Sequence, residues 1–235
     1  MDSIINGVAR FRDSEFPRQQ ALYRHLVHAG QKPAALMISC ADSRVAPEHI
    51  TASGPGEIFV CRNAGNIVPP VAQVNGGVSS AIEYAVLALG VRDVIVCGHS
   101  DCGAMKAILQ PDSLAGMPNV QAWLRHSDAA LRIVQEAYPA SAQANLLHAL
   151  AMENVVAQVG HLRTHPSVAA RLATGQLTLH GWFFHIETGT VMVFDGQAKT
   201  FIPLPESGAL PVAVAPDSRR SMSDRVVSAM AEAAR

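Results

Sequence analysis

Short apolar runs alternate with helical patterns along the first hundred residues. Residues 34–39, 57–61 and 93–97 are mainly apolar and short, as is typical of strands that are buried on both faces of a sheet. Residues 77–89 carry apolar side chains at helical spacing and are followed by Gly90. Because a strand, a helix and a further strand in this order form a crossover, the three strands are predicted to share one largely parallel sheet.

The second half of the chain is predicted to be helical first and extended afterwards. Proline residues divide a helical region over 103–172, in which the clearest helix begins near Ser141 and runs to Leu162. Residues 176–186 and 191–194 then form an antiparallel hairpin that completes the sheet. The predicted fold class is therefore α/β, with a central, mostly parallel sheet, flanking helices and a C-terminal antiparallel strand or hairpin.

The chain is predicted to hold one catalytic domain and a tail. Its 235 residues are long enough for one sizeable core, which we assign to residues 1–205. Residues 14–29 form a moderately amphipathic helix that is expected to cover a sheet face or to reach a partner subunit. Residues 206–235 are rich in Ala, Ser, Pro and Arg and are expected to be a tail, either partly helical or disordered.

Composition and charge narrow the class of function. Apolar residues make up 49% of the chain and charged residues 16%, which indicates a globular protein. The net charge is −1 and no basic stripe is present, so nucleic acid is not expected as a partner. The chain shows neither a signal-peptide pattern nor an apolar window long enough to span a membrane, so no membrane association and a cytoplasmic location are expected.

Four cysteines are too few for a disulfide scaffold in a chain of this length, which leaves catalytic, metal-binding or buried roles. His99 and Cys102 lie in the turn that follows the strand over 93–97, and Cys40 ends the first strand. If those two strands are neighbours, the three side chains point into one crevice at the carboxyl end of the sheet. Two thiolates and one imidazole bind zinc and leave a fourth position open, as in catalytic sites. Cys102 would also lie at the start of a helix, which lowers the pKa of a thiol.

Two charged residues follow Cys40 at alternate positions. Asp42 and Arg44 therefore face the same side of an extended strand end as Cys40 does. A carboxylate there can accept a hydrogen bond from a metal-bound water, or it can itself take the open metal position in a closed state. Arg44 would hold Asp42 away from the metal and keep it ionised.

These two motifs resemble those of the β-class carbonic anhydrases. Cys-x-Asp-x-Arg at 40–44 and His-x-x-Cys at 99–102 carry the resemblance, which covers about residues 3–205. It extends to Arg62-Asn63-Ala64-Gly65-Asn66, Gly76-Gly77-Val78, Glu83-Tyr84-Ala85, Cys97-Gly98-His99 and His180-Gly181-Trp182. The chain is similar to the bacterial branch that includes the carbonic anhydrase associated with cyanate degradation.

The resemblance implies an activity, a cofactor and an assembly. It implies reversible hydration of carbon dioxide to bicarbonate and a proton by a zinc-bound hydroxide, which an Asp42–Arg44 dyad orients. One zinc ion per chain would be bound by Cys40, His99 and Cys102. The pocket would be completed across the interface of a homodimer or higher homo-oligomer. By matching motif positions, substrate-binding residues would be Gln31, Phe59 and Tyr84.

Simpler explanations exist for each of these residues. The three ligands could form a structural zinc site or be buried thiols, although structural sites usually take four protein ligands. Phe59 and Tyr84 could be core residues only. Cys61 and Cys97 are predicted to be small buried apolar side chains, and His180 is predicted to be a core histidine.

The same motifs also bear on other functions. Hydrolysis of carbon disulfide or carbonyl sulfide would use the same zinc chemistry with a different pocket entrance. A non-catalytic scaffold is the alternative from the binding class, but such a protein has no need of Asp42 and Arg44. A serine hydrolase is disfavoured because residues 98–102 lack the final glycine of G-x-S-x-G.

Overall fold

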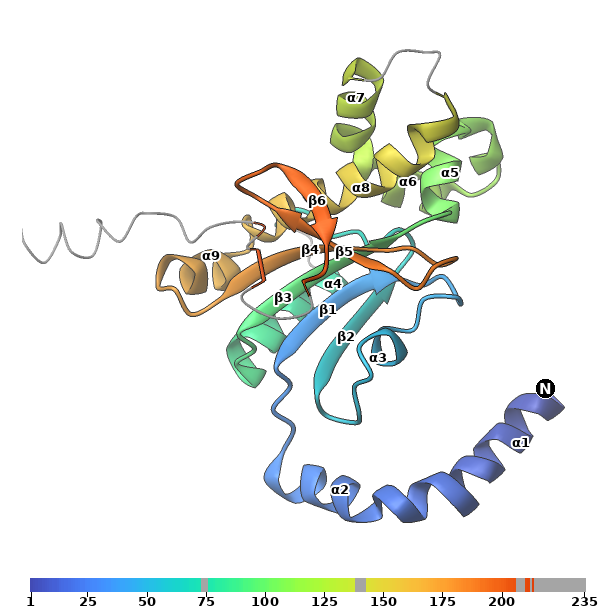
Figure 1. The fold of residues 1–235 in the computed structure, drawn as a ribbon, viewed down its shortest axis with the longest axis vertical. Coiled ribbons are helices and arrows are strands. Elements are labelled where there is room, and N and C mark those ends of the chain that lie inside the picture. Colours follow the sequence, from blue (N-terminus) through green and yellow to red (C-terminus); the bar gives the residue numbers. More distant parts are fainter. Residues whose placement is uncertain (73–75, 138–142, 206–209, 212, 214–235) are drawn as a thin grey trace, which may run out of the picture.

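The protein is built around one six-stranded sheet. The computed structural model describes residues 1–72, 76–137, 143–205, 210, 211 and 213, with the side chains of 143–145 excepted. The strands are β1 (Ala35–Cys40), β2 (Ile58–Asn63), β3 (Asp93–His99), β4 (Thr178–Phe184), β5 (Val191–Asp195) and β6 (Thr200–Pro203). Their order is β2-β1-β3-β4-β5-β6 (Figure 1). Strands β2, β1, β3 and β4 are parallel to one another, β5 is antiparallel to β4, and β6 is antiparallel to β5. This confirms the predicted α/β class and the antiparallel end of the sheet.

The helices pack mainly on one face of this sheet. They are α1 (Asp2–Arg10), α2 (Phe16–Ala29), α3 (Pro47–Ile50), α4 (Gly77–Glu83), α5 (Gly103–Leu109), α6 (Pro118–Leu124), α7 (Asp128–Ala137), α8 (Gln143–Leu162) and α9 (Pro166–Ala173). Short π or 3-10 turns, η1 (Phe11–Glu15), η2 (Tyr84–Leu89), η3 (Pro111–Leu114) and η4 (Arg125–Ser127), join some of them. Pro118 and Pro166 begin helices, as expected from the fixed φ angle of proline.

Helix α8 is packed closely against the two central strands β3 and β4. A Cβ atom at Gly98 would lie 2.5 Å from Val155 Cγ2, and one at Gly181 would lie 3.0 Å from Val155 Cγ1. Glycine is therefore required at both positions by the close approach of the helix. Ala151, Val155, Val159 and Leu162, which recur at helical spacing along α8, are buried. Ser141, where the helix was expected to begin, lies outside the described residues.

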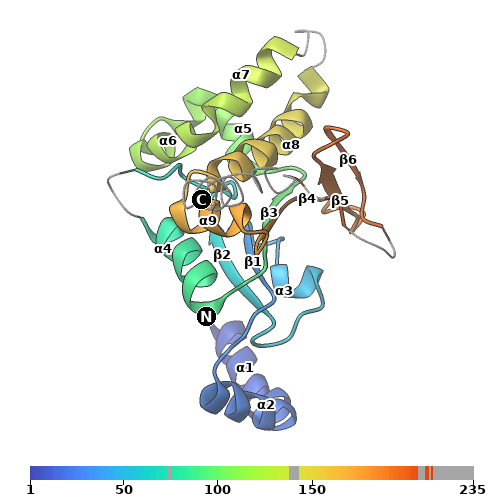
Figure 2. The same ribbon diagram turned by 90° about the vertical axis from the view of Figure 1, so that its left-hand side faces the viewer.

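The N-terminal helices form an arm that leaves the body of the molecule (Figures 1 and 2). Neither α1 nor α2 contains a buried residue. The helix predicted over 14–29 is longer than expected, because helical structure begins at Asp2. Ile4, Ile5 and Val8 are about 60% exposed, so within one chain this arm does not cover the sheet.

The C-terminal prediction falls largely outside the described residues. The tail assigned to 206–235, which was expected to be partly helical or disordered, is described only at 210, 211 and 213. There the backbone N–H of Ala213 donates to the carbonyl of Leu179 at 3.2 Å, so the chain passes the start of β4. None of the described helices has the length and apolar character needed to cross a membrane.

Candidate metal centre

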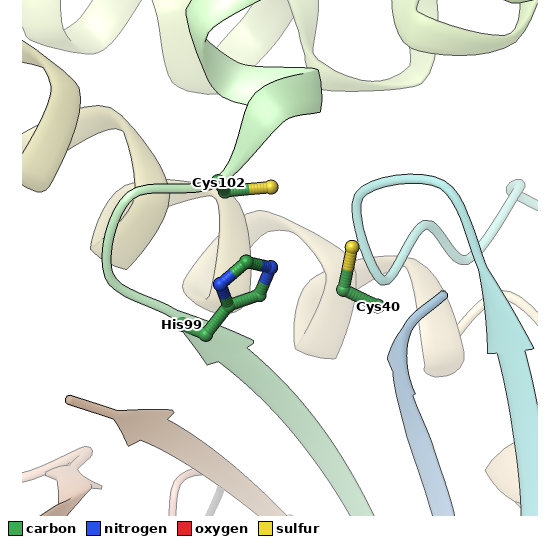
Figure 3. A group of neighbouring side chains, drawn as sticks. All are labelled: Cys40, His99 and Cys102. Atoms are coloured by element: carbon green, nitrogen blue, oxygen red, sulfur yellow. The ribbon is translucent and has the colours of Figure 1, made fainter. Parts of the chain in front are cut away.

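Cys40, His99 and Cys102 come together at the carboxyl end of the sheet (Figure 3). Cys40 ends β1, His99 ends β3, and these two strands are neighbours, which is the condition on which the predicted cluster depended. Cys102 is the N-cap residue of α5. One ligand atom from each residue lies within 4.8 Å of the others, and the three residues are at most 5% exposed. The strand ends therefore place two thiols and one imidazole around a single buried point.

The orientation of His99 leaves one ring nitrogen available to a metal. Nδ1 lies 2.8 Å from the backbone carbonyl of Ser100, so Nδ1 carries the proton and donates it to that oxygen. Nε2 is then a lone-pair acceptor, and it is buried without a hydrogen-bond partner among the described residues. A buried unpaired nitrogen is costly in a protein interior. Together with two nearby sulfur atoms, it fits a tetrahedral zinc ion with one position left open.

The environment of Cys40 favours a thiolate. The neighbouring Cys102 thiol, the His99 imidazole and the backbone N–H of Gly65 hold the pKa of Cys40 well below its ordinary value, although burial acts in the opposite direction. The Gly65 nitrogen lies 3.4 Å from Cys40 Sγ. Because thiolate is the form that binds metal, Cys40 is ready to bind at neutral pH.

Cys102 differs from the sequence-based expectation of a lowered pKa. The hydrogen bond to Cys40 and burial together raise the pKa of Cys102 when no metal is bound. The backbone N–H groups of Met105 and Ala104, at the start of α5, do act in the predicted direction, but they are outweighed. The prediction was wrong because it considered Cys102 alone, whereas the two sulfur atoms share one proton.

Asp42 and Arg44 form a bidentate ion pair beside this cluster. Arg44 Nε donates to Asp42 Oδ1 at 2.9 Å and Nη2 donates to Oδ2 at 2.7 Å. The backbone N–H of Arg44 also donates to Asp42 Oδ1 at 3.0 Å. These bonds hold the pKa of the Asp42 carboxyl well below its usual range. Asp42 is therefore ionised and fixed in orientation across the whole range of physiological pH.

Arg44 also meets a second carboxylate, which the sequence reasoning did not identify. Its Nη1 donates to Asp101 Oδ2 at 2.9 Å, and its Nη2 lies 3.2 Å from the Asp101 carbonyl. Lys106 forms an ion pair with the same carboxylate. The position of Asp101, between two proposed metal ligands in sequence, is the signal that could have found it.

Arg62 fixes the end of strand β1 on its other side. Its Nε donates to the carbonyl of Cys40 at 3.1 Å and its Nη2 donates to the carbonyl of Asp42 at 2.8 Å. The backbone that carries both Cys40 and Asp42 is therefore restrained by a residue from β2. The described hydrogen bonds of Arg62 are all to backbone oxygens near the site, so its role here is structural.

The three predicted substrate-binding residues lie away from the metal cluster within one chain. Gln31 is exposed and precedes β1, at the opposite end of that strand from Cys40. Phe59 pairs with Leu36, whereas Cys40 pairs with Asn63, four residues further along β2. That separation is about 13 Å along a strand. Tyr84 is 51% exposed and its ring lies 6.0 Å from that of Phe59.

The other predicted core residues lie outside the metal cluster. Cys97 is fully buried in β3, and burial raises its pKa to about 12. Cys61 is half-buried in β2, and burial raises the pKa of its thiol too. His180 is buried, with its Nε2 lying 2.8 Å from Asp93 Oδ1. Cys97 and His180 are thus buried as predicted, whereas Cys61 is less buried than predicted.

Comparisons with known proteins identify the family. The carbonic anhydrase family model matches residues 35–191. A carbonic anhydrase of Pseudomonas aeruginosa is 48% identical over 206 residues, covering 88% of this chain and 93% of that protein. Carbonic anhydrase 1 of Escherichia coli O157:H7 is 46% identical over 204 residues, covering 87% of this chain and 92% of that protein.

Solved structures place the chain in one class of that family. The structure of the β-carbonic anhydrase CcaA is 40% identical and superposes with a TM-score of 0.84, covering 93% of this chain and 96% of that chain. One of two tetrameric β-carbonic anhydrases from Sordaria macrospora is 28% identical with a TM-score of 0.71, covering 82% of this chain and 95% of that one. With the Cys-His-Cys cluster at the ends of β1 and β3, these matches show that the chain belongs to the β-class carbonic anhydrases.

Proposed function

We propose that this protein catalyses the reversible hydration of carbon dioxide to bicarbonate and a proton. Cys40, His99 and Cys102 would hold one zinc ion per chain. When bound, zinc supplies a Lewis acid that makes water nucleophilic near neutral pH. The observation that carries this proposal is the buried, unpaired Nε2 of His99, which faces two thiols beside an ionised carboxylate.

Asp42 is proposed to orient the attacking water. Its carboxylate is ionised, so it can accept a hydrogen bond from that water and direct a lone pair of the water oxygen toward carbon dioxide. Arg44 fixes the carboxylate through both of its oxygens. We therefore assign Asp42 a catalytic role and Arg44 the role of holding it.

The same ion pair bears on whether Asp42 closes the site. To become a fourth metal ligand, Asp42 would have to give up its two side-chain hydrogen bonds with Arg44, at 2.9 and 2.7 Å. Charge-assisted paired bonds of this kind are the stronger hydrogen bonds of proteins. Asp101 binds the same guanidinium and restrains it from following Asp42. The contacts thus favour an open site, in which Asp42 does not bind the metal.

The substrate pocket is proposed to need a second copy of the chain. Gln31 and Tyr84 are exposed, and with Phe59 they lie away from the metal cluster of their own chain. In a homodimer or higher homo-oligomer, an amide from Gln31 would bind bicarbonate and the two aromatic rings would keep the cavity dry. The tetrameric assembly of the Sordaria proteins supports this proposal. A cytoplasmic location also remains a prediction.

Stopped-flow carbon dioxide hydration, with zinc measured in the same sample, tests the proposal. We expect about one zinc per chain and hydration that is abolished by a chelator. Carbonyl sulfide and carbon disulfide should be assayed in parallel. One zinc per chain with turnover of a sulfur substrate but not of carbon dioxide would replace the proposed reaction with hydrolysis of carbonyl sulfide or carbon disulfide. Full zinc with no turnover of any of the three would indicate a scaffold.

A further inference from the structure

The peptide groups on both sides of Gly65 are held in place beside the metal centre by hydrogen bonds. The peptide that joins Ala64 and Gly65 donates its N–H to Cys40 Sγ at 3.4 Å, and its carbonyl accepts the indole N–H of Trp123 at 2.9 Å. The next carbonyl, that of Gly65, accepts a bond from Asn154 Nδ2 at 3.0 Å. Residues from α6 and α8 thus fix the orientation of an N–H group that points at a proposed zinc ligand.

Asn154 is itself held in one orientation. Its Oδ1 accepts hydrogen bonds from Ser127 Oγ at 2.7 Å and from Gln158 Nε2 at 2.9 Å. All three side chains are at most 1% exposed. Because Oδ1 is occupied by two donors, the amide nitrogen of Asn154 must face the Gly65 carbonyl. A buried network with all of these bonds made is rigid.

Steric contacts restrict Gly65 further. Its φ angle is +81°, a region that other residues rarely adopt. A Cβ atom there would lie 3.1 Å from Ala104 Cβ and 3.3 Å from Met105 Cε, at the start of α5. The glycine is therefore pressed between α5 and the Cys40 sulfur, with little freedom to turn its N–H away.

We propose that Asn154 and Trp123 are positioning residues that hold the Gly65 N–H against Cys40 Sγ and so limit how much charge this sulfur donates to the metal. A hydrogen bond to a ligand sulfur withdraws electron density from it, and groups of this kind commonly tune metal sites. A less donating sulfur leaves the metal a stronger Lewis acid. The inference rests on the proposed zinc chemistry, and it adds residues that touch neither metal nor substrate.

Three variants separate this role from general support of the loop. Trp123→Phe removes one indole N–H, and Asn154→Leu removes the buried amide at similar volume. Thr164→Val is the matched control, because Thr164 Oγ1 accepts from the N–H of Val71 at 2.8 Å and so holds the same loop at a point away from Cys40. Thermal unfolding of all three shows whether each variant is folded.

The main measurement is the absorption spectrum of the cobalt-substituted protein. Loss of the hydrogen bond from the Gly65 N–H makes the Cys40 sulfur more electron-rich. The thiolate-to-cobalt charge-transfer band is therefore expected to move to lower energy in Trp123→Phe and in Asn154→Leu. Hydration of carbon dioxide by the zinc form should fall roughly tenfold at neutral pH in Asn154→Leu and recover at alkaline pH. Trp123→Phe should change in the same direction by less, and Thr164→Val should match the parent in both measurements.

Unmoved cobalt bands and pH profiles in folded Trp123→Phe and Asn154→Leu proteins would overturn the inference. An equal shift in Thr164→Val would also overturn it, since the effect would then belong to the loop as a whole. If Asn154→Leu does not fold, the spectrum of Trp123→Phe decides. If the parent protein has no hydratase activity, the proposed function fails, while the cobalt spectra still test the positioning role of Asn154 and Trp123.

Discussion

Cys40, His99 and Cys102 are buried side by side, whereas Gln31 and Tyr84 are exposed and lie away from them. In the first group, Cys40 and His99 end two neighbouring parallel strands, and Cys102 lies at the N-cap of the helix that follows the second of them. The second group lies before β1 and on a helical segment, η2, that one chain leaves open to solvent. The resemblance to one family therefore predicted two sets of residues, of which one is held in place by its own chain and the other is exposed.

The difference shows which parts of the proposed site depend on the fold and which depend on assembly. Adjacent strand ends bring Cys40, His99 and Asp42 together within one chain, and core packing and hydrogen bonds of that same chain hold them in place. Gln31 has no such support.

Removing a metal ligand should abolish both zinc binding and activity. Cys40→Ser and His99→Ala each leave two protein ligands, too few for a stable zinc site. Zinc content by atomic absorption and stopped-flow hydration should both fall to background. Full zinc content in folded His99→Ala protein would contradict the assignment of Nε2 as a ligand. Cys97→Ala, which alters a buried cysteine outside the cluster, is the control and should keep its zinc.

Asp42→Asn should keep zinc and lose most of the activity. The amide has nearly the same shape, but it cannot act as an ionised acceptor that orients the attacking water. Loss of such a group typically lowers the rate by about 10²- to 10⁴-fold. Hydration rates per bound zinc are the relevant measurement. A variant as active as the parent would remove Asp42 from the mechanism.

Activity should rise toward alkaline pH. Two thiolates offset the charge of the metal, so the midpoint of the pH profile should lie above the value of about 7 known for zinc bound by three imidazoles. Arg44 keeps the pKa of Asp42 well below its usual range, so Asp42 stays ionised throughout and does not cause the loss at lower pH. A hydration rate that is flat from mildly acidic to alkaline pH would be inconsistent with this account.

Gln31→Leu should reduce hydration moderately while zinc remains bound. Loss of one amide donor to bicarbonate corresponds to about 1 kcal/mol, or roughly a fivefold change. The assay should be paired with a measurement of mass in solution, because the proposed role requires a second copy. A monomer with full activity would refute the shared pocket, and an unchanged rate in an intact dimer would remove Gln31 from it.

Asp101→Asn should have the smallest effect. The pair between Asp101 and Arg44 is about half exposed on both sides, and exposed ion pairs contribute little. Asp42 retains its own two bonds to Arg44 in this variant. We expect less than a threefold change in the hydration rate at neutral pH. A loss as large as that of Asp42→Asn would mean that Asp101 takes part directly in the reaction.

Much of this arrangement could be predicted from local sequence patterns. The crossover between residues 34 and 97 predicted strands in one parallel sheet, and the residues at the strand ends predicted the ligand cluster on the condition that the first and third strands are neighbours. The pairing of Asp42 with Arg44 followed from their alternate spacing. These features depend on short-range periodicity and on the rules that govern parallel sheets.

Other features depend on contacts that a sequence pattern does not reveal. The bond from Asn154 to the Gly65 carbonyl joins residues that are 89 positions apart. The pKa of Cys102 depends more on its sulfur neighbour and on burial than on its own helix. The helix at Asp2–Arg10 was missed although Ile4 and Val8 have helical spacing, and the strand at Thr200–Pro203 is too short to show a pattern.

The most direct test of the account is to titrate metal-free protein with zinc and follow the rate of carbon dioxide hydration at alkaline pH. The rate should rise in proportion to added zinc and stop rising at one zinc per chain, and the same titration of His99→Ala should stay at background. Hydration before any zinc is added, or its absence when each chain has bound one zinc ion, would contradict the assignment of this reaction to the Cys40–His99–Cys102 centre.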